Sequence, residues 1–206
     1  SRTYALSLNR GASAIAQYAY GKASNTGADD KFGISVAVDG DVLVVGAPFE
    51  DSSTMGVNGT PNEGAADSGA VYIYRRTGAT WSQEAFVKAS NTGAGDRFGE
   101  RVAVSGDVVV VGAGFEDGPS DAVSNSGAVY VFRWNGASWG EEAYLRATDA
   151  SANASFGGAV DISGDAIVVG AWGSHPSVSG AGYFFRRVGG VWEQHQKFQR
   201  QSPSAG

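Results

Sequence analysis

The chain repeats one pattern of apolar and polar positions three times. Each copy opens with Phe-Gly, at 32–33, 98–99 and 156–157, and continues through alternating and then uninterrupted apolar residues. A second phrase, Ser-Gly-Ala, follows at residues 68, 126 and 179, and a third begins at Trp81, Trp139 and Trp192. A recurring pattern of this kind indicates a repeat architecture, in which each unit packs against its neighbours.

Each copy predicts four β-strands. In the first copy, Ile34, Val36 and Val38 alternate with small residues, which is the two-residue period of a strand. Residues 42–45 are apolar throughout, as in a strand that is covered on both faces. Residues 71–74 are β-branched and aromatic, and the stretch after each tryptophan is the most polar, as expected of an outer strand. No stretch has the period of a helix.

Short turns and glycines complete the unit. Asp-Gly or Ser-Gly pairs at 39–40, 105–106 and 163–164 predict two-residue hairpin turns between the first and second strands. One glycine in each second strand would let neighbouring backbones approach closely, at Gly46, Gly112 and Gly170. Four strands per unit, with a small and apolar inner pair, are typical of a β-propeller blade. The predicted fold class is therefore all-β, with propeller-type blades of four antiparallel strands.

The repeats divide almost the whole chain. Three full repeats cover 32–97, 98–155 and 156–206, and residues 1–31 are predicted to form the last two strands of a partial N-terminal blade with its connecting loop. The length differences fall between the second and third strands, which predicts a constant scaffold with variable loops. Since a propeller normally needs at least four blades, we expect a piece of a longer protein, or else a ring or stack completed by several chains.

These residues resemble the FG-GAP repeat of integrin α-subunit propellers and related bacterial surface proteins. Residues 32–48, FGISVAVDGDVLVVGAP, carry the motif in full, whereas Gly114 and Trp172 replace its proline in the later copies. The resemblance implies a noncatalytic binding or structural module, extracellular or at the cell surface, that acts in adhesion or protein assembly. Two alternatives are a glycan-binding propeller and an accessory domain of a larger extracellular enzyme.

Composition narrows the function classes further. A net charge of -6 opposes nonspecific binding to nucleic acid or anionic lipid. The absence of cysteine excludes disulfides, thiolate chemistry and cysteine-based zinc sites. No apolar stretch approaches the roughly 20 residues that a membrane helix needs. No acid–base or nucleophile constellation stands out, so we predict no enzyme activity, no nucleic-acid partner and no membrane insertion.

The resemblance also implies a place for calcium, in an Asp-rich loop between the first and second strands. This chain has only tight turns there, which contain Asp41, Asp107 and Asp165. A calcium ion takes about six to eight oxygen ligands, and a tight turn cannot wrap one. We therefore interpret these three aspartates as turn residues.

A different acidic set recurs in the loops that should emerge together at one end of each blade. The members of this acidic set are Asp30, Glu50 and Asp51 in the first copy and Asp96, Glu116 and Asp117 in the second. All of them are absent from the third copy, which has Ala154, Gly173 and Ser174 at the matching places. One hypothesis is a shared cation, with Ca²⁺ favoured by the hard carboxylate oxygens. The alternative is that they are solvated loop acids, or aspartates that bond nearby backbone amides.

The same end of the blades carries the tentative ligand-binding residues. Trp172 occurs only in the third copy, where an exposed aromatic ring could stack on a sugar or on a partner side chain; burial near the axis is the alternative. His175, Asp67 and Asp121 lie in the neighbouring loops. The expected partner at this face is a protein or a glycan, and self-assembly is a further prediction.

Overall fold

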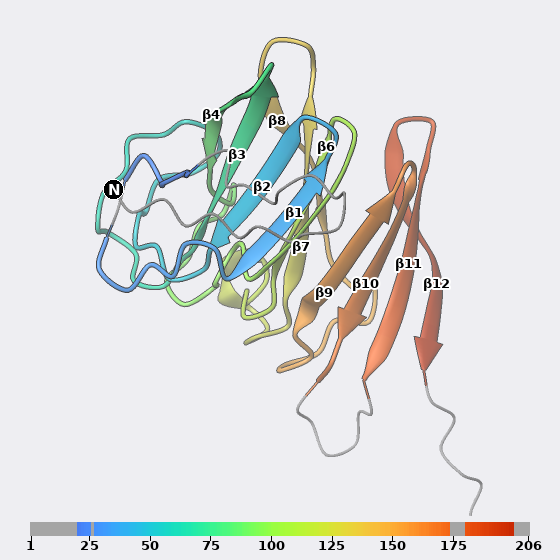
Figure 1. Cartoon of the computed structure of the whole chain (residues 1–206). Helices are drawn as coiled ribbons and strands as arrows, with labels where there is room; N and C mark the ends of the chain where they lie inside the picture. The colour runs from blue at the N-terminus through green and yellow to red at the C-terminus, as the bar shows by residue number, and fades with distance from the viewer. Residues whose placement is uncertain (1–19, 26, 174–179, 200–206) are drawn as a thin grey trace, which may run out of the picture.

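The structure is a computed structural model and describes residues 20–25, 27–173 and 180–199 (Figure 1). Its first sheet comprises β1 (Ser35–Asp39), β2 (Val42–Ala47), β3 (Ala70–Thr77) and β4 (Thr80–Val87). The second comprises β5 (Arg101–Ser105), β6 (Val108–Ala113), β7 (Ala128–Trp134) and β8 (Trp139–Leu145). The third comprises β9 (Phe156–Ser163), β10 (Ala166–Ala171), β11 (Ala181–Val188) and β12 (Val191–Gln199). Within these described ranges, the 3₁₀ turn η1 (Pro119–Asp121) is the only helical element.

Every sheet is antiparallel and follows chain order, which confirms the all-β prediction of four-stranded, propeller-type blades. The first strands β1, β5 and β9 contact one another from sheet to sheet. In Figure 1 the three sheets form an open arc and not a closed ring. The predicted partial blade lies largely outside the described residues, and no strand is assigned to its described part, 20–25 and 27–31.

The predicted hairpin turns are displaced by one residue. β1 ends at Asp39 and β2 begins at Val42, so the turn is Gly40–Asp41 and not Asp39–Gly40. Gly40 has a φ of 55°, the left-handed region that favours glycine at the first position of such a turn. Asp41 is the second residue of this turn, which confirms its interpretation as a turn residue, and its carboxylate accepts a hydrogen bond from Nε of Arg76 at 2.8 Å.

The sheets pack face to face, and the Phe-Gly pairs at 98–99 and 156–157 lie between two of them, whereas Phe32 packs on the outer face of the first sheet. We call the face of a sheet that points toward the preceding unit its upstream face, and the opposite one its downstream face. Val44 and Ile73, on the downstream face of the first sheet, share a core with Val109 and other upstream residues of the second. Phe98 is fully buried in that core, with its ring edge-to-face on Tyr130 at 5.2 Å. The second and third sheets form an equivalent core.

Glycines in the second strands allow this approach, as predicted. A Cβ atom at Gly46 would collide with the carbonyl oxygen of Gly99 in the next unit, and one at Gly112 would collide with that of Gly157. At Gly170 the nearest atoms belong to its own sheet.

The outermost faces of the arc remain exposed among the described residues. Val36 and Val38, on the upstream face of the first sheet, are 63% and 64% exposed. Val168 and Phe198, on the downstream face of the third, are 49% and 53% exposed, whereas their counterparts such as Val110 are buried between the sheets. The alternating apolar residues therefore identify a strand correctly, but the alternation alone does not show that these side chains are buried.

Candidate ligand-binding face

The connections between second and third strands, and those between units, emerge at the same end of the sheets (Figure 1). We call this end the loop face. The two kinds of connection bond one another there: the amide of Arg97 donates to the carbonyl of Asp67 at 3.1 Å. The amide of Ser155 donates to the carbonyl of Asn125 at 3.1 Å in the same way, so the scaffold holds the two loops together in the first and second units.

Glu50 anchors the loop face of the first unit through a buried ion pair. Its side chain is 2% exposed and accepts a hydrogen bond from Nζ of Lys88 at 2.8 Å. Asn25 Nδ2 donates to the same carboxylate at 2.9 Å and the amide of Ser52 at 3.1 Å, and the hydroxyl of Ser52 donates to it as well. Burial lowers the pKa of Lys88, and the hydrogen bond and charge of Glu50 oppose that shift. The pair ties the loop after β2 to the end of β4.

Glu116 occupies the same place in the second unit but is bonded by neutral donors. It accepts hydrogen bonds from Asn91 Nδ2 at 2.6 Å, the amide of Gly118 at 2.9 Å and the hydroxyl of Tyr144 at 3.0 Å. Arg146, the counterpart of Lys88, donates instead to Ser126 Oγ at 2.7 Å. Burial, followed by the nearby charge of Glu116, raises the pKa of Tyr144, so the phenol stays a donor.

Asp30 and Asp96 shape the connections between units. Asp30 accepts the amide of Gly27 at 2.7 Å, and Asp96 accepts the amide of Gly93 at 2.8 Å. Both aspartates are buried. Burial raises the pKa of Asp30 and raises that of Asp96 to about 7, although the amide hydrogen bonds oppose the shift in each case.

Asp51 and Asp117 close the loop between the second and third strands. Asp51 accepts the amide of Asp67 at 2.8 Å, and Asp117 accepts the amide of Asn125 at 2.6 Å. Each bond links the two ends of one loop, which is a structural role for a loop aspartate.

The acidic set thus has protein partners throughout, and four of its six members are buried and not solvated. Across the described ranges, no three His, Cys, Asp or Glu side chains gather in a group that could hold a metal ion. The shared cation stays a prediction. The contacts favour the alternative in which aspartates bond backbone amides.

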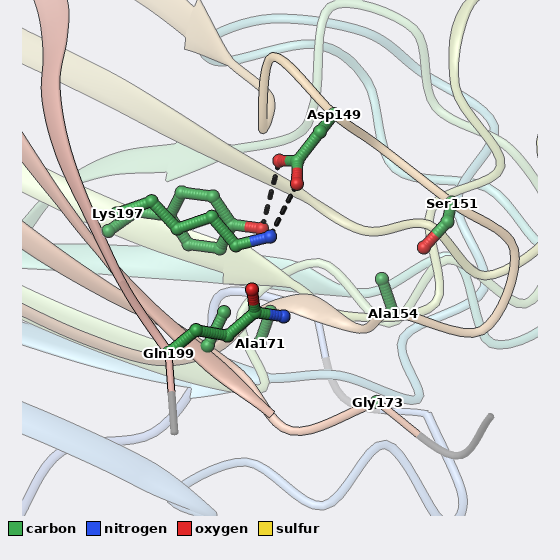
Figure 2. A pocket seen from close by; sticks show the side chains of 9 residues that line it. Asp149, Ser151, Ala154, Ala171, Gly173, Lys197 and Gln199 are labelled. Carbon is green, nitrogen blue, oxygen red and sulfur yellow. Dashed lines mark hydrogen bonds and ion pairs between the residues drawn. The ribbon is translucent and has the colours of Figure 1, made fainter. Parts of the chain in front are cut away.

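In the third unit, where the acidic set is missing, a cavity of about 110 Å³ opens (Figure 2). Ala154 lines it at the position of Asp30 and Asp96, and Gln199 stands in place of Lys88. Gly173 also lines it, but it follows Trp172 directly and so takes the position of Phe49 and Phe115, which corrects the prediction that it matches an acid. The carboxylate of Asp149 faces Lys197 across one side and pairs with its ammonium (Figure 2). This pair lowers the pKa of Asp149 and raises that of Lys197. The cavity has room for a few water molecules but not for a typical small-molecule ligand.

The tentative ligand residues occupy different places on the loop face. Trp172 is 53% exposed, so of the two alternatives for this ring, exposure and burial near the axis, the structure has the exposed one. Its role in ligand binding stays a prediction. Asp121 is exposed in η1, whereas Asp67 is half-buried and contributes its amide and carbonyl to the loop. His175 lies outside the described residues. Trp172 and Asp121 are therefore the exposed members of this set.

Sequence reasoning missed a row of cationic and aromatic side chains that crosses the three units. Lys31 Nζ lies 3.9 Å from the ring centre of Phe49. The guanidinium of Arg97 lies between two rings, 5.0 Å from Phe49 and 4.3 Å from Phe115. The ring of Phe115 then meets Trp172 edge-to-face at 6.5 Å. We call these five residues the cation–aromatic row. A basic residue just before Phe-Gly and a phenylalanine after Gly-Ala-Pro or Gly-Ala-Gly were the available signal.

The sequence matches a known repeat family. The family described as FG-GAP repeat matches residues 22–74, 81–132 and 139–185. The second and third matches begin at the start of a fourth strand, β4 or β8, and each of the three matches ends within the third strand of the following sheet. No curated protein gives a significant match. Among the described residues, no helix has the length and apolar character required to cross a bilayer.

Proposed function

This chain belongs to the FG-GAP repeat family, and we propose that it is a noncatalytic extracellular module that binds a protein or glycan partner through its loop face, in adhesion or assembly. The observation that supports this proposal is the contrast between scaffold and loops. The strands have the same order and similar lengths in every sheet, whereas the loops after β2 and β6 differ in length and run over residues 48–69 and 114–127. Variable loops on a constant scaffold are the usual location of binding residues.

The reactive side chains of the loop face support a noncatalytic role. Lys88 Nζ donates to Ser68 Oγ at 2.7 Å, a pairing that can activate a serine nucleophile in enzymes. Here both side chains are buried, and Ser68 Oγ also donates to the carbonyl of Ser52 at 2.9 Å. A substrate cannot reach this serine, so the pair supports the loop and does not catalyse a reaction.

Because the chain has no cysteine, single cysteines can direct a bulky label to either end of the sheets. Ala122→Cys lies on the loop face and Ala79→Cys in the β3–β4 turn at the opposite end, and both positions are exposed. Each variant would be coupled to polyethylene glycol maleimide and tested on immobilised matrix proteins, acidic polysaccharides and neutral polysaccharides. We expect the Ala79→Cys conjugate to bind at least one of these surfaces and the Ala122→Cys conjugate to bind it much less, because its label covers the loop face. Equal retention of both conjugates on every surface would contradict the proposal.

A second candidate role is self-assembly, with the downstream face of one copy on the upstream face of another. Polar contacts across the internal interfaces favour it. Asp39 Oδ2 accepts the amide of Gly106 at 2.7 Å, and Ser105 Oγ accepts that of Gly164 at 3.2 Å. Ser163 is the counterpart of Asp39 and Ser105 in the third sheet, so its hydroxyl could accept the same kind of amide hydrogen bond from a second copy.

Light scattering tests this role directly. We expect the particle mass to rise with concentration and Val168→Glu to abolish the rise, because the substitution buries a charge at the contact. A monomer mass at every concentration would exclude self-assembly and leave the loop-face proposal intact.

A further inference from the structure

The cation–aromatic row contains two basic side chains that have no acidic partner. Among the described residues, no carboxylate lies within salt-bridge distance of Lys31 or Arg97, although most other basic side chains are paired. The acids that flank the row in the sequence have other partners: Glu50 pairs with Lys88, and Asp96 accepts a backbone amide. Glu100 lies 4.0 Å from the guanidinium of Arg101. Two cations without an acidic partner are therefore presented on the surface of a chain whose net charge is -6.

The geometry of Arg97 suits an anionic ligand. The rings of Phe49 and Phe115 lie near its guanidinium carbon, which holds the group in place. The N–H donors of a guanidinium lie in its plane and form a fork that matches a carboxylate. Arg97 is half-buried, so the aromatic neighbours also limit competition from water.

Both basic residues occupy backbone positions that disfavour them. The φ of Lys31 is 54° and that of Arg97 is 55°, in the left-handed region that glycine and asparagine adopt more readily. Ser155, at the same position in the third unit, has a φ of 52° and carries no charge. Strained positions of this kind concentrate at functional sites.

Trp172 adds a flat apolar surface at the end of the row. The third unit has Ser155 at the position of Lys31 and Arg97, and there the indole of Trp172 contacts the ring of Phe115 edge-to-face. The indole occupies space next to Gly158, where a Cβ atom would collide with it. The counterparts of Gly158 are Ile34 and Glu100, so the third unit alone leaves this space open. An exposed indole near a guanidinium that suits a carboxylate is complementary to an acidic sugar, because such a sugar has an apolar ring face and a carboxylate at its edge.

We propose that the cation–aromatic row binds an acidic polysaccharide, with Arg97 and Lys31 engaging sugar carboxylates and Trp172 stacking on a sugar ring. This inference rests on the proposed role of the loop face and names the ligand class of that face. A neutral glycan would leave both cations without a partner, and an acidic peptide would not require the exposed indole.

Calorimetric titration with polygalacturonate tests the proposal, with dextran as the neutral polymer. We expect polygalacturonate to bind and dextran not to bind. Arg97→Gln should weaken binding by about tenfold or more, because it removes a charge-assisted hydrogen bond. Arg186→Gln, which removes the same charge from an exposed position on β11, should leave affinity within about twofold. Equal losses in the two variants, or no binding of polygalacturonate, would overturn the proposal.

Poly-L-glutamate separates the glycan from an acidic peptide. Trp172→Ala should weaken polygalacturonate binding severalfold and leave any poly-L-glutamate binding unchanged, while thermal melting confirms that the variant is folded. If poly-L-glutamate binds as tightly as polygalacturonate and Trp172→Ala affects neither, the site takes acidic peptides and the inference fails. The loop-face function would then stand, since the labelled Ala122→Cys variant tests it independently of ligand class.

Discussion

Replacing Lys88 by methionine tests whether a buried ion pair fastens the loop face to the sheet. The side chain is 1% exposed, and its ammonium pairs with Glu50 and donates to Ser68. Methionine fills a similar volume without the charge. The substitution therefore leaves the Glu50 carboxylate buried without its cation, with Asn25 and Ser52 as remaining donors.

The structure sets the expected magnitude. Removing one partner of a buried ion pair costs about 3–5 kcal/mol, a large share of the roughly 5–15 kcal/mol that stabilises a typical domain. Arg146→Met is the matched control, because Arg146 lies at the same position in the second unit and bonds a neutral hydroxyl. Loss of such a bond, from a charged donor to a neutral acceptor, should cost about 1.5–3 kcal/mol. Adding Glu50→Gln to Lys88→Met should recover part of the larger loss, because no buried charge remains.

Urea unfolding followed by circular dichroism gives these free energies of unfolding. The reasoning is refuted if Lys88→Met costs no more than Arg146→Met, or if Glu50→Gln makes the Lys88→Met protein less stable still. Either result would mean that the pair is hydrated in solution and does not anchor the loop.

Three further predictions follow from the same contacts. The pKa of Asp96 is raised from 3.8 to about 7, so its stabilising effect is present below pH 3.8 and is lost as the pH rises through about 7. Asp96→Asn should therefore raise the free energy of unfolding at pH 8 by about 1 kcal/mol or more in urea titrations, and an unchanged pH profile would contradict this. Gly112→Ala should lower the free energy of unfolding by about 1–3 kcal/mol, because the added methyl group would collide with the backbone of Gly157. Gly140→Ala is the control and should cost far less, because a methyl group there has open space. Similar losses for the two variants in urea unfolding would exclude the tight approach. Since protein donors already bond the acidic set, we expect millimolar calcium to leave the Tm unchanged, and a rise of several degrees would restore the shared-cation hypothesis.

Much of the fold could be predicted because the apolar period reports strands directly. The four strands per unit, the turn residue Asp41 and the close approaches at Gly46 and Gly112 all follow from local sequence. Burial could not be predicted in the same way. Val36 and Val102 have the same pattern, but among the described residues only Val102 has another sheet beside it.

The site was harder to predict because its contacts join distant residues. Glu50 reads as a solvated loop acid until the fold brings Lys88, 38 residues away, against it. Arg97 reads as a surface charge until Phe49 and Phe115 from two units enclose it. The acidic set was visible as a pattern of joint presence and absence, but that pattern does not distinguish a cation site from loop anchors.

A crystal structure of the chain with trigalacturonate tests the central claim most directly. The account predicts sugar density on the loop face, with a carboxylate at the guanidinium of Arg97 and a pyranose ring against the indole of Trp172. Density confined to the turns at the opposite end, or to the open faces of the first and third sheets, would contradict it.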